Sequence, residues 1–336
     1  MSKMLEVKNL KTGFRKEEHI QMIISGIDFE IHEGEIVGLV GESGSGKSVT
    51  SLSIMRLLHD TPGEIMSGEV IYKGVDLLAQ SESKMRKYRG KELAMIFQEP
   101  MTSLNPVLKI GKQLMEIITL HMKMSKREAK AHGIKMLELV GIPRAKDIME
   151  EYPHQLSGGM RQRVMIAMQI SCNPSLLIAD EPTTALDVTI QAQILNLLKE
   201  IQEKTQMGIL LITHDLGVVA EVCDRVIVMY AGRIVEEATT EELFENPRHP
   251  YTQGLIASIP KIGSNQKKLN SIRGTVPNPS DMPNGCKFAP RCSKVMEVCL
   301  EKEPDLLSMG RRASRCWLET EIEDFGEEVS VCQERY

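Results

Sequence analysis

A glycine-rich run has the residue types and the order that bind the phosphates of a nucleotide. It reads Gly41-Glu42-Ser43-Gly44-Ser45-Gly46-Lys47-Ser48. The glycines let successive backbone N–H groups turn inward around phosphates, and the lysine adds a point charge beside the dipole of a following helix. The hydroxyl of Ser48 would then hold Mg²⁺. A glycine-rich turn without a ligand is the alternative. The run's position between a predicted strand, Glu35–Val40, and a predicted helix beginning near Ser48 favours nucleotide binding.

Two adjacent carboxylates, Asp180 and Glu181, follow the aliphatic run Leu176–Ala179. Because open α/β sheets bind ligands at the carboxyl ends of their strands, both side chains are expected at that edge. Asp180 is then a Mg²⁺ ligand, directly or through water, and Glu181 orients the water that attacks the γ-phosphate. The alternative is that both residues cap the next element. With a phosphate-binding loop upstream, the sequence predicts hydrolysis of a nucleoside triphosphate.

Four cysteines lie in an irregular segment near the end of the sequence, at Cys286, Cys292, Cys299 and Cys316. Four thiolates in such a segment suit an iron–sulfur cluster or a structural zinc. Structural zinc sites favour close ligand pairs with about two to four residues between them, and such pairs are absent here. The spacing therefore favours iron–sulfur, with zinc and four unliganded buried cysteines as alternatives.

The elements that must position these residues alternate short aliphatic runs with longer amphipathic stretches, from residue 5 to about residue 245. This alternation is typical of a largely parallel sheet covered by helices, so the predicted fold class is α/β. Val226–Val228 and Arg233–Glu236 are expected to form a hairpin that closes this part of the chain. The clearest predicted strands are Glu35–Val40, Leu93–Phe97, Leu176–Ala179 and Gly208–Thr213.

Two segments depart from that alternation. Residues 101–170 lack a strand run and carry helical stretches broken at Gly141, Pro143 and Pro153, which predicts an inserted helical subdomain. Beyond Pro247 prolines multiply and the periodicity fades. We therefore predict an ATP-binding domain over residues 1–245 and a small, irregular, cysteine-containing domain over residues 246–336.

Composition excludes several function classes. The net charge is −5, from 41 basic and 46 acidic residues spread along 336 positions, so no nucleic-acid partner is expected. A membrane-spanning helix needs about eighteen uninterrupted apolar residues, and no window of the sequence has them. The start MSKMLEVKNL lacks the apolar core of a signal peptide. We expect a cytoplasmic chain. Its seven cysteines, an odd number, argue against a disulfide framework.

The run Leu156-Ser157-Gly158-Gly159-Met160, followed by Arg161-Gln162-Arg163, closely resembles the signature of ABC transporter ATPases. Other phosphate-loop ATPases lack this signature, and the resemblance covers residues 1 to about 245. It implies an ABC ATPase fold of the phosphate-loop NTPase class. It also implies that Ser157, Gly158 and Gly159 contact ATP held by an opposite subunit, so that two cassettes stack head to tail.

The resemblance implies roles for four further residues, all in the family's order. They are Phe14 as the aromatic stacked on adenine, Gln98 as the Q-loop residue that binds ATP and Mg²⁺, Asp187 as the D-loop aspartate, and His214 as the catalytic histidine that reaches the γ-phosphate. A lone histidine can equally be structural. The place of His214 after a predicted strand matches the family.

Three segments resemble the dipeptide and oligopeptide importers within that family, namely Phe97–Pro106, Asp187–Gln193 and Arg248–Thr252. The C-terminal extension of those ATPases resembles Gly285–Cys292 and carries a [4Fe–4S] cluster, which implies that the four cysteines ligate one here. The branch usually pairs two different ATPases, and this chain resembles the first of the pair. Nickel and metallophore importers have ATPases too similar to exclude.

The resemblance as a whole implies a peripheral ATPase on the cytoplasmic face of a membrane, which energises import of dipeptides or oligopeptides. The implied partners are a second homologous ATPase, two transmembrane permease subunits and an extracytoplasmic substrate-binding protein. One rival is a soluble ABC ATPase that acts on nucleic acid or ribosomes. Another is a module that binds ATP without hydrolysing it, which the set Lys47, Asp180, Glu181 and His214 disfavours.

Overall fold

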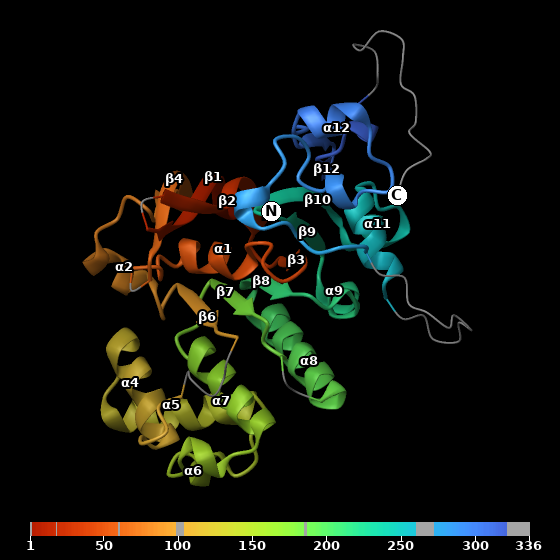
Figure 1. Cartoon of the computed structure of the whole chain (residues 1–336). Coiled ribbons are helices and arrows are strands. Elements are labelled where there is room, and N and C mark those ends of the chain that lie inside the picture. The colour runs from red at the N-terminus through yellow and green to blue at the C-terminus, as the bar shows by residue number, and fades with distance from the viewer. Residues whose placement is uncertain are drawn as a thin grey trace. The chain divides into compact units, whose positions relative to one another are not determined.

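The computed structural model describes residues 2–17, 19–59, 61–98, 104–184, 187–259 and 272–320 (Figure 1). The chain divides into two compact units, each assembled from segments far apart in the sequence. The first unit comprises Met1–Glu6, Glu30–Val37 and Val70–Ile212. The second unit comprises Val7–Phe29, Gly38–Glu69 and Thr213–Tyr336.

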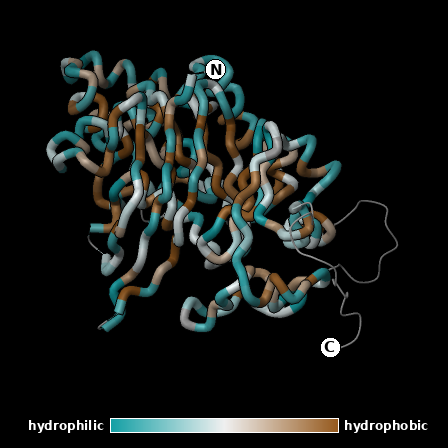
Figure 2. The backbone as a smooth tube through the Cα atoms, turned by 90° about the horizontal axis from the view of Figure 1, so that it is seen from above, coloured by the Kyte–Doolittle hydropathy of each residue, from teal (hydrophilic) through white to brown (hydrophobic). Residues whose placement is uncertain are grey.

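Buried parallel strands form the centre of the first unit. Strand β7 (Leu176–Asp180) pairs in parallel with β6 (Leu93–Ile96) on one side and with β8 (Gly208–Thr213) on the other. Every residue of these three strands is buried, which explains their continuous aliphatic composition. Figure 2 shows such stretches as brown segments among teal ones. The three predicted strands are confirmed to within one residue at their ends.

Helices account for the segment in which the sequence predicts no strand. They are α4 (Ile110–Met122), α5 (Lys126–Leu139), α6 (Ala145–Ile148), the 3₁₀ turn η1 (Pro153–Gln155) and α7 (Gly158–Ile170). Ser125 begins α5 with a capping box, in which its hydroxyl accepts from the Glu128 N–H and the Glu128 carboxylate accepts from the Ser125 N–H. Helix α8 (Val188–Thr205) follows β7 and buries one apolar face, which includes Ile194 and Ile201. That these helices form a separate subdomain stays a prediction.

Antiparallel strands characterise the second unit. Strands β9 (Arg225–Tyr230) and β10 (Arg233–Thr239) form the predicted hairpin, and Ala231 and Gly232 both have positive φ at its turn, as a tight hairpin requires. Two short strands beyond it were not predicted from the sequence. β12 (Arg312–Ser314) pairs with β10, and β11 (Leu307–Met309) pairs with β12. The cysteine-containing segment is thus joined to the edge of this sheet.

The remaining elements complete the two units. Strands β1, β2 and β4 run through parts of both units, in the order β2-β1-β4-β5. The helices, strands and 3₁₀ turns not yet given are β1 (Lys3–Lys16), β2 (His19–His32), β3 (Ile36–Val40), α1 (Lys47–Ile54), β4 (Gly63–Tyr72), β5 (Val75–Asp76), α2 (Glu82–Tyr88), α9 (Leu216–Val222), α10 (Thr240–Glu245), α11 (Pro250–Ala257), η2 (Pro279–Asp281), η3 (Ala289–Arg291), α12 (Glu297–Glu301) and η4 (Trp317–Glu319).

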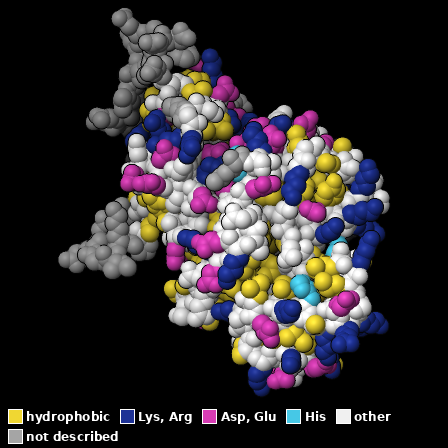
Figure 3. Space-filling model, turned by 180° about the vertical axis from the view of Figure 1, so that it is seen from behind, with side chains coloured by type: hydrophobic (Ala, Val, Ile, Leu, Met, Phe, Trp, Pro, Cys, Tyr) yellow, Lys and Arg dark blue, Asp and Glu magenta, His cyan; other side chains and the backbone are white. Residues whose placement is uncertain are grey.

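The charged side chains of both signs are interspersed on the face drawn in Figure 3. This distribution agrees with the near balance of 41 basic and 46 acidic residues in the sequence. Within the described ranges, no helix combines the length and the apolar content that crossing a membrane requires.

Candidate nucleotide site

The nucleotide loop, residues Gly41–Ser48, connects β3 to α1 in the second unit. Its glycines meet different demands. A Cβ at Gly41 would lie 2.2 Å from the Met229 carbonyl oxygen, so only glycine fits there. Gly44 has a φ of +80°, and a Cβ added to it would meet nothing within 4 Å. That open, exposed backbone is a surface that phosphate oxygens can approach. Helix α1 begins at Lys47, one residue earlier than predicted.

Lys47 folds back over the loop. Its Nζ donates to the carbonyl oxygens of Gly41 at 2.8 Å and Glu42 at 3.1 Å, and the residue is only 6% exposed. The Ser45 hydroxyl is buried, and no described residue gives it a hydrogen-bond partner. Ser43 is exposed and Ser48 is half-buried at the first turn of α1. A buried cation beside an exposed, glycine-rich backbone is the donor set that a polyphosphate needs.

Gln98 and Glu181 lie together in the first unit, although they are 83 residues apart in the sequence. The Gln98 amide Nε2 donates to Glu181 Oε2 at 3.1 Å, and the Thr184 hydroxyl donates to the same oxygen at 2.8 Å. Glu181 has a φ of +48°, which costs about 1–3 kcal/mol for a residue other than glycine. Its N–H donates to the Ile212 carbonyl oxygen at 2.9 Å, which anchors this conformation to β8. A strained carboxylate, whose Oε2 accepts two side-chain hydrogen bonds, is suited to orienting a water molecule.

Asp180 is the last residue of β7 and is 4% exposed. The signature residue Ser157 is the N-cap of α7, and its hydroxyl accepts from the Met160 N–H at 3.3 Å. Gln162 of the same helix donates from Nε2 to the Pro182 carbonyl oxygen at 2.5 Å. The signature helix is therefore bonded directly to the turn that follows the two carboxylates. A shift of α7 would move that turn.

Four further predicted residues have these positions. Asp187 is the N-cap of α8 and accepts from the Ile190 N–H at 2.9 Å. Gly159 is in the first turn of α7, where a Cβ would lie 3.0 Å from Ile190 Cγ2. His214 is exposed and directly follows β8, and Phe14 is half-buried on β1. The structure gives the position of each of these four residues, and their contacts with ATP stay predictions. Ala185 and Leu186, which precede Asp187 and resemble the rest of the family's D-loop, lie outside the described residues.

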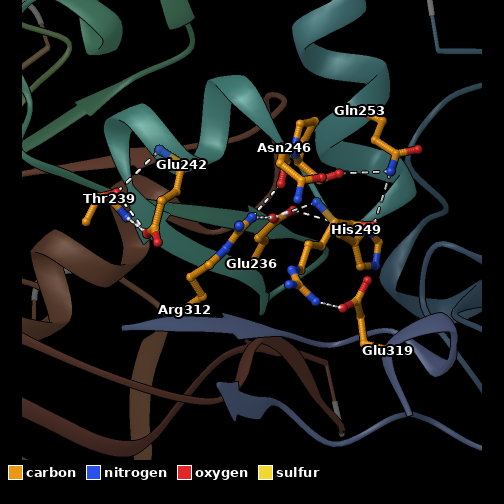
Figure 4. Close-up of polar contacts among 10 residues, drawn as sticks. Glu236, Thr239, Glu242, Asn246, His249, Gln253, Arg312 and Glu319 are labelled. Carbon is orange, nitrogen blue, oxygen red and sulfur yellow. Dashed lines mark hydrogen bonds and ion pairs between the residues drawn. The ribbon is translucent and has the colours of Figure 1, made fainter. Parts of the chain in front are cut away.

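A set of buried polar residues surrounds the segment Arg248–Thr252 and was not predicted from the sequence, in which this segment marks only a family resemblance. Figure 4 shows His249, the N-cap of α11, beside Glu236 of β10 and Arg312 of β12. The buried Glu236 carboxylate accepts from the N–H groups of Arg248 at 2.8 Å and His249 at 2.9 Å. Burial lowers the pKa of His249 to about 3, so its neutral Nδ1 accepts from the Tyr251 N–H at 3.0 Å. This segment therefore caps α11 and fixes it to the sheet.

The four cysteines of the predicted cluster are all described. Burial, and to a lesser extent the thiols of Cys299 and Cys292, raises the pKa of Cys286 to about 11. Burial raises the pKa of Cys316 to about 12, with a smaller contribution from the other three thiols. The four side chains are therefore within electrostatic range of one another. In the described part of the chain, no three His, Cys, Asp or Glu residues form a group that could hold a metal ion.

Comparison with known proteins decides the family. The ABC transporter family matches residues 24–184, and the C-terminal region of oligopeptide and dipeptide transporters matches residues 235–299. The oligopeptide transport ATP-binding protein AppD of Bacillus subtilis is 58% identical over 95% of this chain and 97% of its own. This chain belongs to the ABC transporter ATP-binding family. The dipeptide transport ATP-binding protein DppD of the same organism is 49% identical over 95% of this chain and 96% of its own.

Solved structures agree with the ABC cassette fold. The dimeric bacterial ABC transporter cassette MJ0796 is 28% identical, with a TM-score of 0.64, and covers 70% of this chain and 99% of its own. The cassette cbiO1 of Clostridium perfringens is 26% identical, with a TM-score of 0.62, and covers 73% of this chain and 92% of its own. The expected α/β, phosphate-loop fold of an ABC ATPase is thus confirmed.

Proposed function

We propose that this ABC subunit binds and hydrolyses ATP to drive the import of dipeptides or oligopeptides through a membrane transporter. The observation that carries the proposal is the 58% identity to an oligopeptide transport ATP-binding protein along nearly the whole chain. The identity extends into the C-terminal region, where residues 235–299 match the family described as the C-terminal region of oligopeptide and dipeptide transporters. The cassette alone would not separate a peptide importer from other ABC transporters.

The residues described above have the chemistry for each part of ATP hydrolysis. The N–H groups of the nucleotide loop and Lys47 receive the β- and γ-phosphates. Ser48, Gln98 and Asp180 would hold Mg²⁺, which neutralises charge that develops on the phosphate oxygens. Glu181, oriented by its two side-chain hydrogen bonds, positions the attacking water.

Each nucleotide site is completed by the signature of the opposite cassette, and in this chain the signature lies at the start of α7. Helix α7 begins at Gly158, after its N-cap Ser157, and the first-turn N–H groups and the dipole of a helix favour an anion at this end. We assign this surface to the γ-phosphate of ATP held by a second, homologous ATPase. His214 donates a hydrogen bond to the γ-phosphate in its own subunit, and Phe14 stacks on the adenine.

The subunit supplies energy and does not select cargo. Two permease subunits cross the membrane, an extracytoplasmic binding protein captures the peptide, and the ATPase pair lies on the cytoplasmic face. Import of nickel or a metallophore by the same machinery is the second candidate, because such transporters share the cassette. The names of three Bacillus subtilis relatives favour peptides.

Purification of the tagged chain from membranes tests this function. We expect two permeases and a second ATPase to copurify, and we expect peptide-loaded binding protein to stimulate ATP hydrolysis by the complex in liposomes. Stimulation by nickel or a nickel chelate, with none by peptide, would favour the second candidate. Copurification with ribosomes in place of permeases would overturn transport altogether.

We propose a [4Fe–4S] group at the four cysteines because thiolates are the donors that such a cluster requires, although the described side chains are not grouped for metal binding in this structure. The N–H of Lys294 donates to Cys292 Sγ at 3.3 Å. Such a bond favours the thiolate form of Cys292, and thiolates are the ligands that iron requires.

We expect anaerobically purified protein to be brown and to contain about four iron atoms and four labile sulfides per chain. Cys292→Ser should remove the cluster and expose the C-terminal region to limited proteolysis, because ligation orders that region. Cys223→Ser, at a buried cysteine remote in sequence from the cluster, is the matched control and should keep the iron. One zinc per chain without labile sulfide would show that the site holds a structural zinc in place of iron. The absence of both iron and zinc would contradict the cluster.

A further inference from the structure

Glu42, the second residue of the nucleotide loop, is held at both its backbone and its side chain by residues of the C-terminal region. Its N–H donates to the Tyr251 hydroxyl at 2.9 Å. Its carboxylate receives two parallel bonds from Arg291, with Nη1 to Oε2 at 2.5 Å and Nη2 to Oε1 at 2.9 Å. All three residues belong to the second unit. A bidentate arginine–carboxylate pair fixes orientation as well as distance.

Arg291 is itself rigidly placed. Its Nε donates to the Arg273 carbonyl oxygen at 2.9 Å, and Nη2 also donates to the Gly274 carbonyl oxygen at 3.2 Å. The guanidinium lies over the Tyr230 ring at 5.7 Å, and its side chain is 4% exposed. Nε and Nη2 are thus bonded to backbone carbonyl oxygens, which hold the guanidinium in place independently of Glu42.

Tyr251 is equally fixed. It is fully buried in α11, and its ring packs edge-on against Tyr230, with centroids 4.7 Å apart. The start of α11 is held by His249 and by the Glu236 carboxylate, as Figure 4 shows. The C-terminal strand β12 contributes Arg312, which lies 3.8 Å from Glu236. The hydroxyl that binds the loop is therefore supported by the sheet and by the C-terminal segment together.

Glu42 also determines the shape of the loop. Its carbonyl oxygen accepts from Lys47 Nζ at 3.1 Å and from the Ser45 N–H at 3.2 Å. A displacement of Glu42 would therefore shift both the turn and the acceptor of the phosphate-binding lysine. Phosphate binding requires Lys47 to exchange these carbonyls for phosphate oxygens while the loop keeps its form.

We propose that Tyr251 and Arg291 are positioning residues for ATP, which hold the nucleotide loop through Glu42. The C-terminal region is thereby a part of the ATP site's support as well as a cysteine-containing appendage. The 3₁₀ turn that carries Arg291 lies between Cys286 and Cys292, so the order of that segment is transmitted to the loop. The inference rests on ATP binding at the nucleotide loop and is independent of the transported substrate.

Equilibrium binding of ATP with Mg²⁺ to the full chain, purified anaerobically, tests this role. We expect Arg291→Met and Glu42→Gln each to weaken ATP binding by about five- to tenfold, because each frees the loop to adopt shapes that bind phosphate poorly. The double variant should be no weaker than either single variant, since both act through one contact. Arg291→Lys should recover part of the affinity. Tyr251→Phe, which removes only the hydroxyl, should also weaken binding.

The kinetics of the assembled transporter separate positioning from mere packing. In the Arg291→Met and Glu42→Gln transporters, the KM for ATP should rise by about five- to tenfold, and kcat should change by less than about twofold. Arg311→Met, at an exposed arginine of the same region, is the matched control and should leave ATP affinity unchanged. If Arg291→Met fails to fold, Glu42→Gln and Tyr251→Phe still decide the question.

Unchanged ATP affinity in Glu42→Gln and Tyr251→Phe would overturn the proposal. Independent, additive losses in the double variant would also overturn it, because they would show that Arg291 acts elsewhere. Lys47→Ala, which removes the phosphate-binding charge itself, should abolish binding and so tests the loop separately. A chain with the expected ATP results that does not support peptide import would contradict the proposed function and leave this inference standing.

Discussion

Glu181→Gln is expected to lower ATP hydrolysis by about 10²- to 10⁴-fold, the usual contribution of a positioned general base. The amide keeps the shape of the side chain and can still accept from the Thr184 hydroxyl, but it loses the charge that orients and polarises water. ATP binding should remain nearly intact because the phosphates are held by the nucleotide loop. Phosphate release and equilibrium ATP binding, measured on the same preparation, check both halves of the expectation.

A matched control is available in the same unit. Glu200 is exposed on α8, and Glu200→Gln changes the charge equally without touching the site. The Glu181 variant should also accumulate as an ATP-bound dimer in gel filtration, because closure is no longer followed by hydrolysis. Turnover within a few-fold of wild type, about 1 kcal/mol in barrier, would remove Glu181 from the catalytic role.

Turnover per subunit should fall by about 10²- to 10³-fold when the isolated chain is diluted below the dimerisation range, the loss expected when donors to a developing charge are removed. The reason is the position of the signature. Ser157 and Gly159 begin α7 in the first unit, and in our proposal they act only on nucleotide held by another cassette. Adding the permeases and the companion ATPase should restore activity.

The measurement is ATP hydrolysis per subunit over a dilution series, with dimer content followed by light scattering. Ser157→Arg should act like dilution at every concentration, since a bulky side chain at the N-cap blocks the approach of a partner's phosphate. Met160→Gln is a mild change in the same turn and should leave activity near wild type. Equal turnover per subunit at high dilution, with no partner present, would contradict a shared site.

Local chemistry in the sequence determined much of this protein. The nucleotide loop, the Asp180–Glu181 pair and the signature are short segments, whose function follows from residue type and from adjacent strands and helices. The buried strands β6, β7 and β8 were recognisable because parallel strands covered on both faces are continuously aliphatic. Strands β11 and β12 escaped prediction, because three residues are too few for a periodic pattern.

The tertiary structure alone decided which distant residues meet. Gln98 meets Glu181 across 83 residues, and Glu42 meets Tyr251 across 209 residues and Arg291 across 249. No local pattern records such pairs, since each partner has an ordinary residue type in its own neighbourhood. Hydrophobic periodicity reports only which face of an element is buried, whereas a buried arginine–carboxylate pair depends on how the folded chain brings two segments together. The support of the nucleotide loop therefore became visible only in the folded chain.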